Sequence, residues 1–164
     1  MATRKQVTSE PKKKTRKRAK KAKHPVDSIR FSKQLKWLEH YLRRASDKMP
    51  TMELPRYVRP FKPPKNKILR TLGNAYFDTM TISLATHDQL LQKQPDNTYL
   101  VYRIVKLNKK RILETFAHEL AHFRYPTHNY EQEEYTRAVF KAFEFKETCP
   151  LCGGIGKVIA LCEG

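Results

Sequence analysis

The chain has 164 residues, which suits one compact domain with extensions and excludes two domains of the usual size. It contains 34 Lys and Arg against 16 Asp and Glu, a formal net charge of +18, so polyanions and above all nucleic acid are the expected partners. No apolar run of about 18 residues exists and no apolar segment follows the N-terminal charges, so we expect neither a membrane-spanning helix nor a secretory signal.

We therefore expect a soluble, intracellular protein with no membrane partner. The sequence does not distinguish the nucleus, a nucleoid and a viral assembly, and it does not indicate an oligomeric state.

Residues 1–27 are predicted to form a disordered basic arm. Residues 1–24 contain 11 Lys and Arg and one acid, a net charge of +10, with too few apolar side chains to offset the entropy of ordering. The arm could bind nucleic acid, serve as a nuclear localisation signal or only solvate the chain, and its pattern does not separate these roles. The candidate nucleic-acid-binding residues are Lys12, Lys13, Lys14, Arg16, Lys17, Arg18, Lys20, Lys21 and Lys23.

A first helix is predicted over about residues 29–46. Apolar side chains recur there at steps of four and three, which places one stripe along a helical face: Phe31, Leu35, Leu38, Leu42 and Ala45. Five prolines between residues 50 and 64 then rule out a regular helix and indicate an extended connector over the surface.

A pair of strands is predicted next. Apolar and polar residues alternate over residues 80–84, which is typical of a half-buried strand. Residues 69–77 are its expected partner or lead-in, with Gly73 at a bend or bulge. After a polar loop at 92–97, residues 99–105 form either a short strand or an extended lead into the following helix.

Two further helices are predicted in the second half of the chain. Apolar residues recur at helical spacing over about residues 108–124, and Pro126 ends that helix. Asn129 then opens a helix over about residues 130–145, with Gln132 three residues on, which is the arrangement of a capping box.

The first of these helices contains the motif "HELAH". Residues at i and i+4 project from one helical face, so His118 and His122 can bind the same cation. Glu119 need not be a ligand and can instead take a proton from a metal-activated water, as the general base of a metallopeptidase does. His128 follows the helix-breaking Pro126 and can be the third ligand, which leaves a fourth position open as in a catalytic zinc site.

The spacing of the three histidines also matches the metzincin pattern, but that pattern has glycine where this chain has Tyr125, so the metzincin fold is not inferred. A single buried histidine is usually a satisfied core residue rather than a ligand. Here three histidines share one helix and its exit, and the chain has only three others, His24, His40 and His87. The pattern therefore predicts a metal site at the triad.

Two segments resemble the SprT-like zincins and their WLM and YgjP-like relatives, which are small metallopeptidase domains. These segments are "ILRTLGNAYFDTMTISLATH" and "ETFAHELAHFRYPTHNYEQEEYTRAVF", and together they cover most of residues 68–145. The resemblance implies a catalytic zinc, with His118, His122 and His128 as its ligands and Glu119 as the base.

The same resemblance implies an α+β fold, with a minimal zincin-like domain over residues 28–146. Its expected parts are an N-terminal helix, a small antiparallel sheet, the active-site helix and a following helix. The strand at residues 79–85 is expected to line the cleft, where an extended peptide would add as another strand. SprT-like proteins are often associated with DNA, so the resemblance favours DNA over RNA as the partner of the arm and a protein as the substrate.

Residues 147–164 form a cysteine-rich segment, "CPLCGGIGKVIALC" with its flanks. Cys149 and Cys152 belong to a Cys-Pro-x-Cys-Gly turn typical of a zinc knuckle, and Cys162 offers a third thiolate. The fourth ligand is open: Glu163, the terminal carboxylate, a distant histidine, or a residue that would follow Gly164. A second, structural zinc would have to hold this short hairpin together, because the hairpin has too few residues for a core.

Two functions from different classes follow from these patterns. The first is a zinc-dependent metallopeptidase of the SprT-like class that acts on or near nucleic acid. The second is a non-catalytic, zinc-containing structural protein associated with nucleic acid in a ribonucleoprotein or viral assembly. Glu119 favours the enzyme, because a structural metal site needs no unligated carboxylate beside it.

In a metallopeptidase, a further side chain can donate a hydrogen bond to the oxyanion that forms when water attacks the peptide carbonyl. Three tyrosines are candidates for this donor, and their spacing selects none: Tyr125, Tyr130 and Tyr135.

Overall fold

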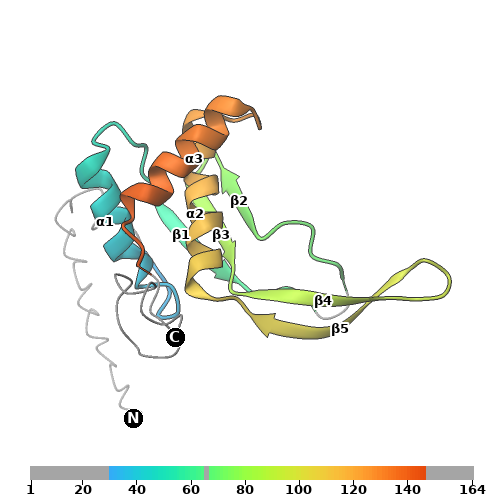
Figure 1. Cartoon of the computed structure of the whole chain (residues 1–164). Coiled ribbons are helices and arrows are strands. Elements are labelled where there is room, and N and C mark those ends of the chain that lie inside the picture. Colours follow the sequence, from blue (N-terminus) through green and yellow to red (C-terminus); the bar gives the residue numbers. More distant parts are fainter. Residues whose placement is uncertain (1–29, 65–66, 147–164) are drawn as a thin grey trace, which may run out of the picture.

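The computed structural model describes residues 30–64 and 67–146. The basic arm and the cysteine-rich segment, with the candidate residues on them, lie outside the described residues. The fold is α+β, as predicted, and its elements in chain order are α1 (Leu38–Lys48), β1 (Tyr57–Phe61), β2 (Gly73–Tyr76), β3 (Thr81–Ala85), β4 (His87–Lys93), β5 (Tyr99–Lys106), α2 (Lys109–Arg124) and α3 (Tyr130–Ala142) (Figure 1).

A three-stranded sheet in the order β1-β3-β2 lies beneath α2. β2 pairs antiparallel with β3, as expected, but β1 pairs parallel with it, so the prediction of a purely antiparallel sheet is wrong. The connector between α1 and β1 returns the chain to the end of the sheet at which β3 also starts. β1 therefore enters the sheet in the same direction as β3.

β1 lies inside the proline-rich segment, where we expected only an extended connector. Pro60 is tolerated because β1 is an edge strand and because backbone groups alternate in direction along a strand. The carbonyl of Phe61 faces β3 and accepts a hydrogen bond from Thr86 N–H at 3.1 Å. The nitrogen of Pro60, which has no hydrogen to donate, therefore faces the open edge.

β3 is buried almost throughout rather than half-buried. Ile82 and Leu84 are fully buried and Thr81 is also enclosed, while Ser83 alone in this strand is partly exposed. The middle strand has neighbours on both sides and α2 above it, so its polar positions are covered as well. Met80 lies before the strand, in the turn from β2, with a φ of 50°.

The first helix is shorter than predicted, because α1 begins at Leu38 rather than near residue 29. Arg30 forms a β-bridge with Tyr57, which keeps the chain extended there, and residues 33–37 form turns. The N–H of Leu38 donates to the carbonyl of Leu35 at 2.9 Å, a contact three residues apart rather than four. The apolar stripe still reaches the core, since Leu35, Leu38, Leu42 and Ala45 are all buried.

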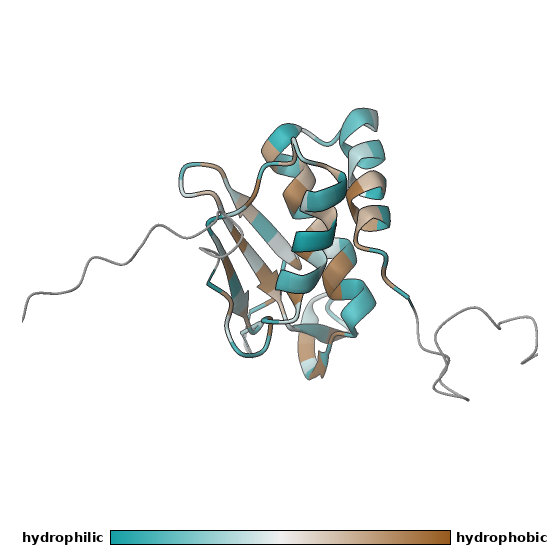
Figure 2. Cartoon of the chain, turned by 90° about the vertical axis from the view of Figure 1, so that its left-hand side faces the viewer, coloured by the Kyte–Doolittle hydropathy of each residue, from teal (hydrophilic) through white to brown (hydrophobic). Residues whose placement is uncertain are grey.

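The two predicted C-terminal helices are confirmed, with α3 ending at Ala142 rather than near 145. The side chain of Asn108 caps α2 by accepting from Arg111 N–H at 2.8 Å. α2 lies between the sheet and α3, and the ring of Phe116 stacks on that of Phe143 with centroids 5.8 Å apart. Apolar and polar segments alternate along the helices, as expected for helices that bury one face each (Figure 2).

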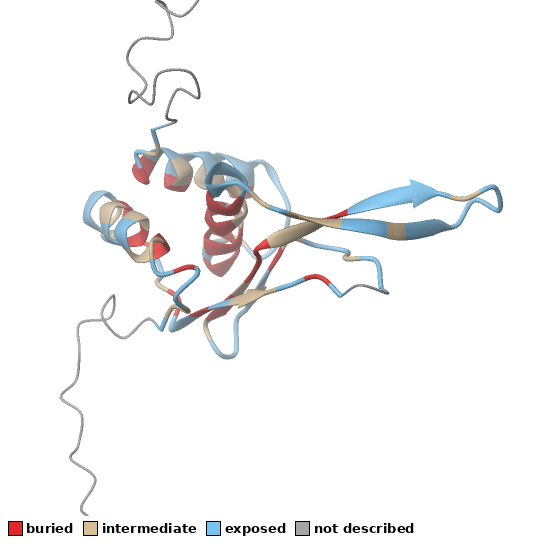
Figure 3. Cartoon of the chain, turned by 90° about the horizontal axis from the view of Figure 1, so that it is seen from below, coloured by how far each residue is buried: buried red, intermediate tan, exposed pale blue. Residues whose placement is uncertain are grey.

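β4 and β5 form a hairpin that extends away from the helices and is largely exposed toward its tip (Figures 1 and 3). Of the two alternatives for residues 99–105, the strand is therefore correct. β4 was not predicted, because "HDQLLQK" shows no alternation of apolar and polar residues. Among the helices of the described residues, none has the length and apolar character needed to cross a membrane.

Candidate metal centre

The three predicted histidines meet at one point. The Nε2 atom of His118 lies 3.0 Å from Nε2 of His122 and 3.1 Å from Nε2 of His128. Ligand atoms bound to one tetrahedral zinc at about 2.0–2.1 Å lie about 3.3 Å apart, so this convergence is close to the arrangement that such an ion requires. The three side chains are therefore close enough to bind a single metal ion.

Two different parts of the chain bring the triad together. His118 and His122 lie one turn apart on the same face of α2, and their rings meet edge to face. α2 ends at Arg124, and the chain then turns back through Pro126, so that the exposed His128 approaches from the loop before α3. The helix thus supplies two of the possible ligands and the turn after it supplies the third.

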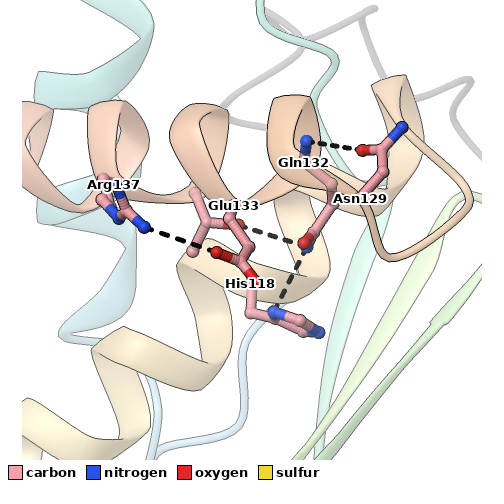
Figure 4. A network of polar contacts seen from close by, with 6 residues as sticks. His118, Asn129, Gln132, Glu133 and Arg137 are labelled. Atoms are coloured by element: carbon pink, nitrogen blue, oxygen red, sulfur yellow. Dashed lines mark hydrogen bonds and ion pairs between the residues drawn. The ribbon is translucent and has the colours of Figure 1, made fainter.

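The outer ring nitrogens of the two helical histidines have partners. The Nδ1 atom of His122 lies 3.2 Å from the carbonyl oxygen of Tyr125, to which it can donate. The Nδ1 atom of His118 lies 3.2 Å from the side-chain amide of Gln132 on α3 (Figure 4). A proton held on Nδ1 leaves the Nε2 lone pair available, so the contact of His122 with the carbonyl of Tyr125 favours the ring form that can bind a metal through Nε2. The Gln132 atom nearest to His118 is the amide nitrogen, which is a donor.

The environment of the histidines also favours their neutral form. Burial lowers the pKa of His118, and the proximity of His122 and His128 lowers it further. Burial is also the main cause of the lowered pKa of His122. Because only a neutral imidazole has a lone pair to donate, the site is able to bind a metal at neutral pH.

Glu119 lies beside the triad and is 6% exposed. Burial raises the pKa of its carboxyl group to about 7, and a hydrogen bond from the N–H of Ala75 on β2 partly offsets this effect. In the metal-free chain the carboxyl group can therefore take up and release a proton near neutral pH.

Gly73 allows β2 to approach α2 beside Glu119. A Cβ atom at this position would lie 2.7 Å from both Cγ and Oε1 of Glu119, and 2.7 Å from Cγ2 of Thr115. The sequence suggested a bend or bulge at Gly73, which is wrong, because its pairing with Leu84 is in regular register. The glycine serves instead for close packing between strand and helix.

A cavity of about 710 Å³ opens beside the triad. Its walls include His118, Glu119 and His122 from α2, and Gly73 and Ala75 from β2. The expectation that residues 79–85 line this cleft and accept an added strand is wrong: β3 is paired on both sides, whereas within the described part of the chain β2 has a strand on one side only.

The N–H and C=O groups of alternate residues in β2 point away from β3, toward the edge of the strand that is unpaired within the described residues. The carbonyl of Leu72 accepts from Ala85 N–H at 2.7 Å, so Leu72 and every second residue after it face β3. The backbone groups of Gly73 and Ala75 consequently face away from the sheet, and the N–H of Ala75 is used by Glu119.

The three candidate oxyanion donors do not reach the cavity, since none of them lines it. Tyr125 and Tyr135 contact each other, and the guanidinium group of Arg124 lies over both rings, 5.9 and 5.5 Å from their centroids. Tyr130 is 70% exposed at the start of α3.

Sequence analysis identified the triad and Glu119 but missed three residues that position them: Gly73, Ala75 and Gln132. A glycine inside a strand pattern does signal a close backbone approach, although not to which element. The contacts of Ala75 and Gln132 have no comparable signal. The candidate ligands Cys149, Cys152 and Cys162, and the basic residues from Lys12 to Lys23, lie outside the described residues.

Comparison of the chain with protein-family models, with curated proteins and with solved structures finds no match.

Gly73→Ala should lower the free energy of unfolding by about 1–3 kcal/mol, because the added methyl group overpacks the contact between β2 and α2. Urea-induced unfolding measures this cost. The same substitution in a Thr115→Ser, Glu119→Ala background should cost less than half as much, because the atoms that it meets are gone. Equal costs in the two backgrounds would show that the close approach is not the cause.

The contribution of Glu119 to the stability of the metal-free protein should fall as the pH rises from about 5 to 8. The pKa of Glu119 is raised from 4.5 to about 7 in the folded chain, so between these values the folded state binds more protons than the unfolded state. The raised pKa corresponds to about 3 kcal/mol that is lost over this range. Glu119→Gln removes this contribution, and urea unfolding of both proteins in chelator should show the difference between them growing with pH. Parallel pH profiles would contradict the assignment.

Proposed function

We propose that the protein is a zinc-dependent metallopeptidase of the SprT-like zincin class. The observation that carries the proposal is the convergence of three histidine Nε2 atoms beside a buried carboxyl group that is not part of the triad, on the wall of an open cavity. A structural metal site closes its coordination with protein ligands, whereas a catalytic site leaves a position open next to a base.

The donor set fits zinc. Three imidazole nitrogens are the ligands of many catalytic zinc ions, whereas Mg²⁺ and Ca²⁺ prefer oxygen ligands. When bound at such a site, zinc supplies a Lewis acid that makes water a stronger acid.

Glu119 is the proposed general base. Its carboxyl group lies between α2 and β2 and on the wall of the cavity. From there it would take a proton from the attacking water and pass it to the leaving amine. The hydrogen bond from Ala75 N–H keeps the carboxylate in one orientation while it does so.

We place the substrate along β2. An extended peptide could pair with the outward-facing N–H of Gly73 and the carbonyl groups of Gly73 and Ala75, which would bring its own carbonyl groups past the triad. Main-chain pairing selects an extended, accessible segment rather than a particular side chain, so a protein with an unfolded stretch is the expected substrate.

We assign nucleic acid, and DNA before RNA, as the partner that brings the enzyme to its substrate. The support is the charge of the arm: residues 1–24 carry +10 and leave +8 for the remaining residues. Phosphate contacts made by Lys and Arg gain affinity by releasing counterions and do not depend on a folded site.

The purified protein should retain zinc and should hydrolyse a denatured protein substrate. Glu119→Gln should keep the zinc and lose at least about a hundredfold in rate, because the base is removed and the ligands stay. Metal analysis and a gel-based cleavage assay, with and without DNA, measure both quantities. Glu114→Gln is the matched control, since this residue lies on the same helix and lines the same cavity.

Absence of zinc from the wild-type protein would contradict the metal site. A protein that retains zinc but cleaves nothing in the presence of DNA or RNA would favour the non-catalytic structural role instead.

Replacement of the nine basic residues between Lys12 and Lys23 by Gln should weaken binding to DNA and flatten its dependence on salt. Each phosphate contact that is lost reduces the slope of log affinity against log salt by about 0.9 for duplex DNA. Fluorescence anisotropy at salt concentrations from about 50 to 200 mM measures the slope. An unchanged slope would assign DNA binding to the rest of the chain.

A further inference from the structure

Gln132 is a fully buried polar residue in the first turn of α3. Asn129 caps this helix by accepting from Gln132 N–H at 2.9 Å, which is the first half of the predicted capping box. The second half is absent from the hydrogen bonds of these two residues, because the side chain of Gln132 points across the interface to α2 (Figure 4). The side chain of Gln132 therefore contacts α2 instead of capping α3.

The amide of Gln132 contacts one possible metal ligand and one neighbour on its own helix. Its Nε2 atom lies 3.2 Å from Nδ1 of His118 and 3.2 Å from Oγ1 of Thr136. Its Oε1 atom is buried and has no hydrogen-bond partner among the described residues. The contacts to His118 and Thr136 thus account for the polar interactions of this side chain.

Metal binding determines which ring nitrogen of His118 carries the proton. Its Nε2 atom faces His122 and His128, so a metal held by the triad would use the Nε2 lone pair and the proton would lie on Nδ1. A buried Nδ1–H needs an acceptor. A half-turn of the Gln132 amide exchanges its oxygen and nitrogen, and Oε1 would then accept from both His118 Nδ1–H and the Thr136 hydroxyl.

We propose that Gln132 is the positioning residue for His118, an inference that rests on the proposed metal site. Its amide oxygen holds the ring of His118 with the proton on Nδ1, so that Nε2 points into the triad. The carbonyl of Tyr125 has the same relation to His122. α3 therefore contributes to the metal site through a side chain that contacts no metal.

The test compares zinc affinities by competition with a chromophoric chelator. Gln132→Leu keeps the size of the side chain and removes the acceptor, and it should weaken zinc binding about 10- to 100-fold. Gln132→Glu restores an acceptor for Nδ1–H and should return the affinity to within about threefold of the wild type. Thr136→Val, the matched control, removes the other partner of the amide and should change the affinity less than about threefold.

Cobalt-loaded proteins provide a second readout. The visible absorption of bound Co²⁺ reports its coordination, so the spectrum of Gln132→Glu should match that of the wild type. Circular dichroism of each metal-free variant checks that α3 is intact, which is expected because the backbone N–H bonded to Asn129 remains.

The outcomes separate this inference from the proposed function. A wild-type protein without affinity for zinc would overturn both. If the wild type binds zinc and Gln132→Leu binds it equally well, the role of Gln132 is wrong and the metal site stands. If Gln132→Leu and Gln132→Glu are equally weak, the residue acts by packing, and its role as an acceptor is overturned.

Discussion

The close contact between β2 and α2 at Gly73 is the constraint on which the rest of the candidate site depends. Without a side chain at this position, the strand lies against the carboxyl group of Glu119 and buries most of it. The same approach brings the N–H of Ala75 within hydrogen-bonding reach of that carboxylate. The raised pKa of Glu119 is a consequence of this packing.

The turn between α2 and α3 has a comparable role for the histidines. It places His128 against the two histidines of α2, and the carbonyl of Tyr125 contacts the outer nitrogen of His122. The helix that follows directs Gln132 toward His118. The residues from the end of α2 to the first turn of α3 thus include His128 and contact both His118 and His122.

Local sequence patterns were sufficient to predict the elements whose backbone hydrogen bonds lie within the element itself, as in a helix. α2 and α3 were predicted within a few residues, because the apolar spacing of α2 and the cap Asn129 of α3 lie in the local sequence. β1 and β4 were missed, because their pairing partners are remote or their pattern is weak. β1 is a strand because it pairs with β3, and its one proline, Pro60, argues against a strand until the direction of each backbone group is known.

The amino-acid sequence alone determined that two histidines one helical turn apart and a third beyond a proline could bind one metal ion, since helical spacing is a local property. Tertiary structure decided which strand borders the cavity and how far Glu119 is buried. It also decided that Gln132 contacts His118 instead of completing a capping box. These features depend on distances between segments that are remote in the chain. Tertiary packing sets these distances, and the periodicity of the sequence does not predict them.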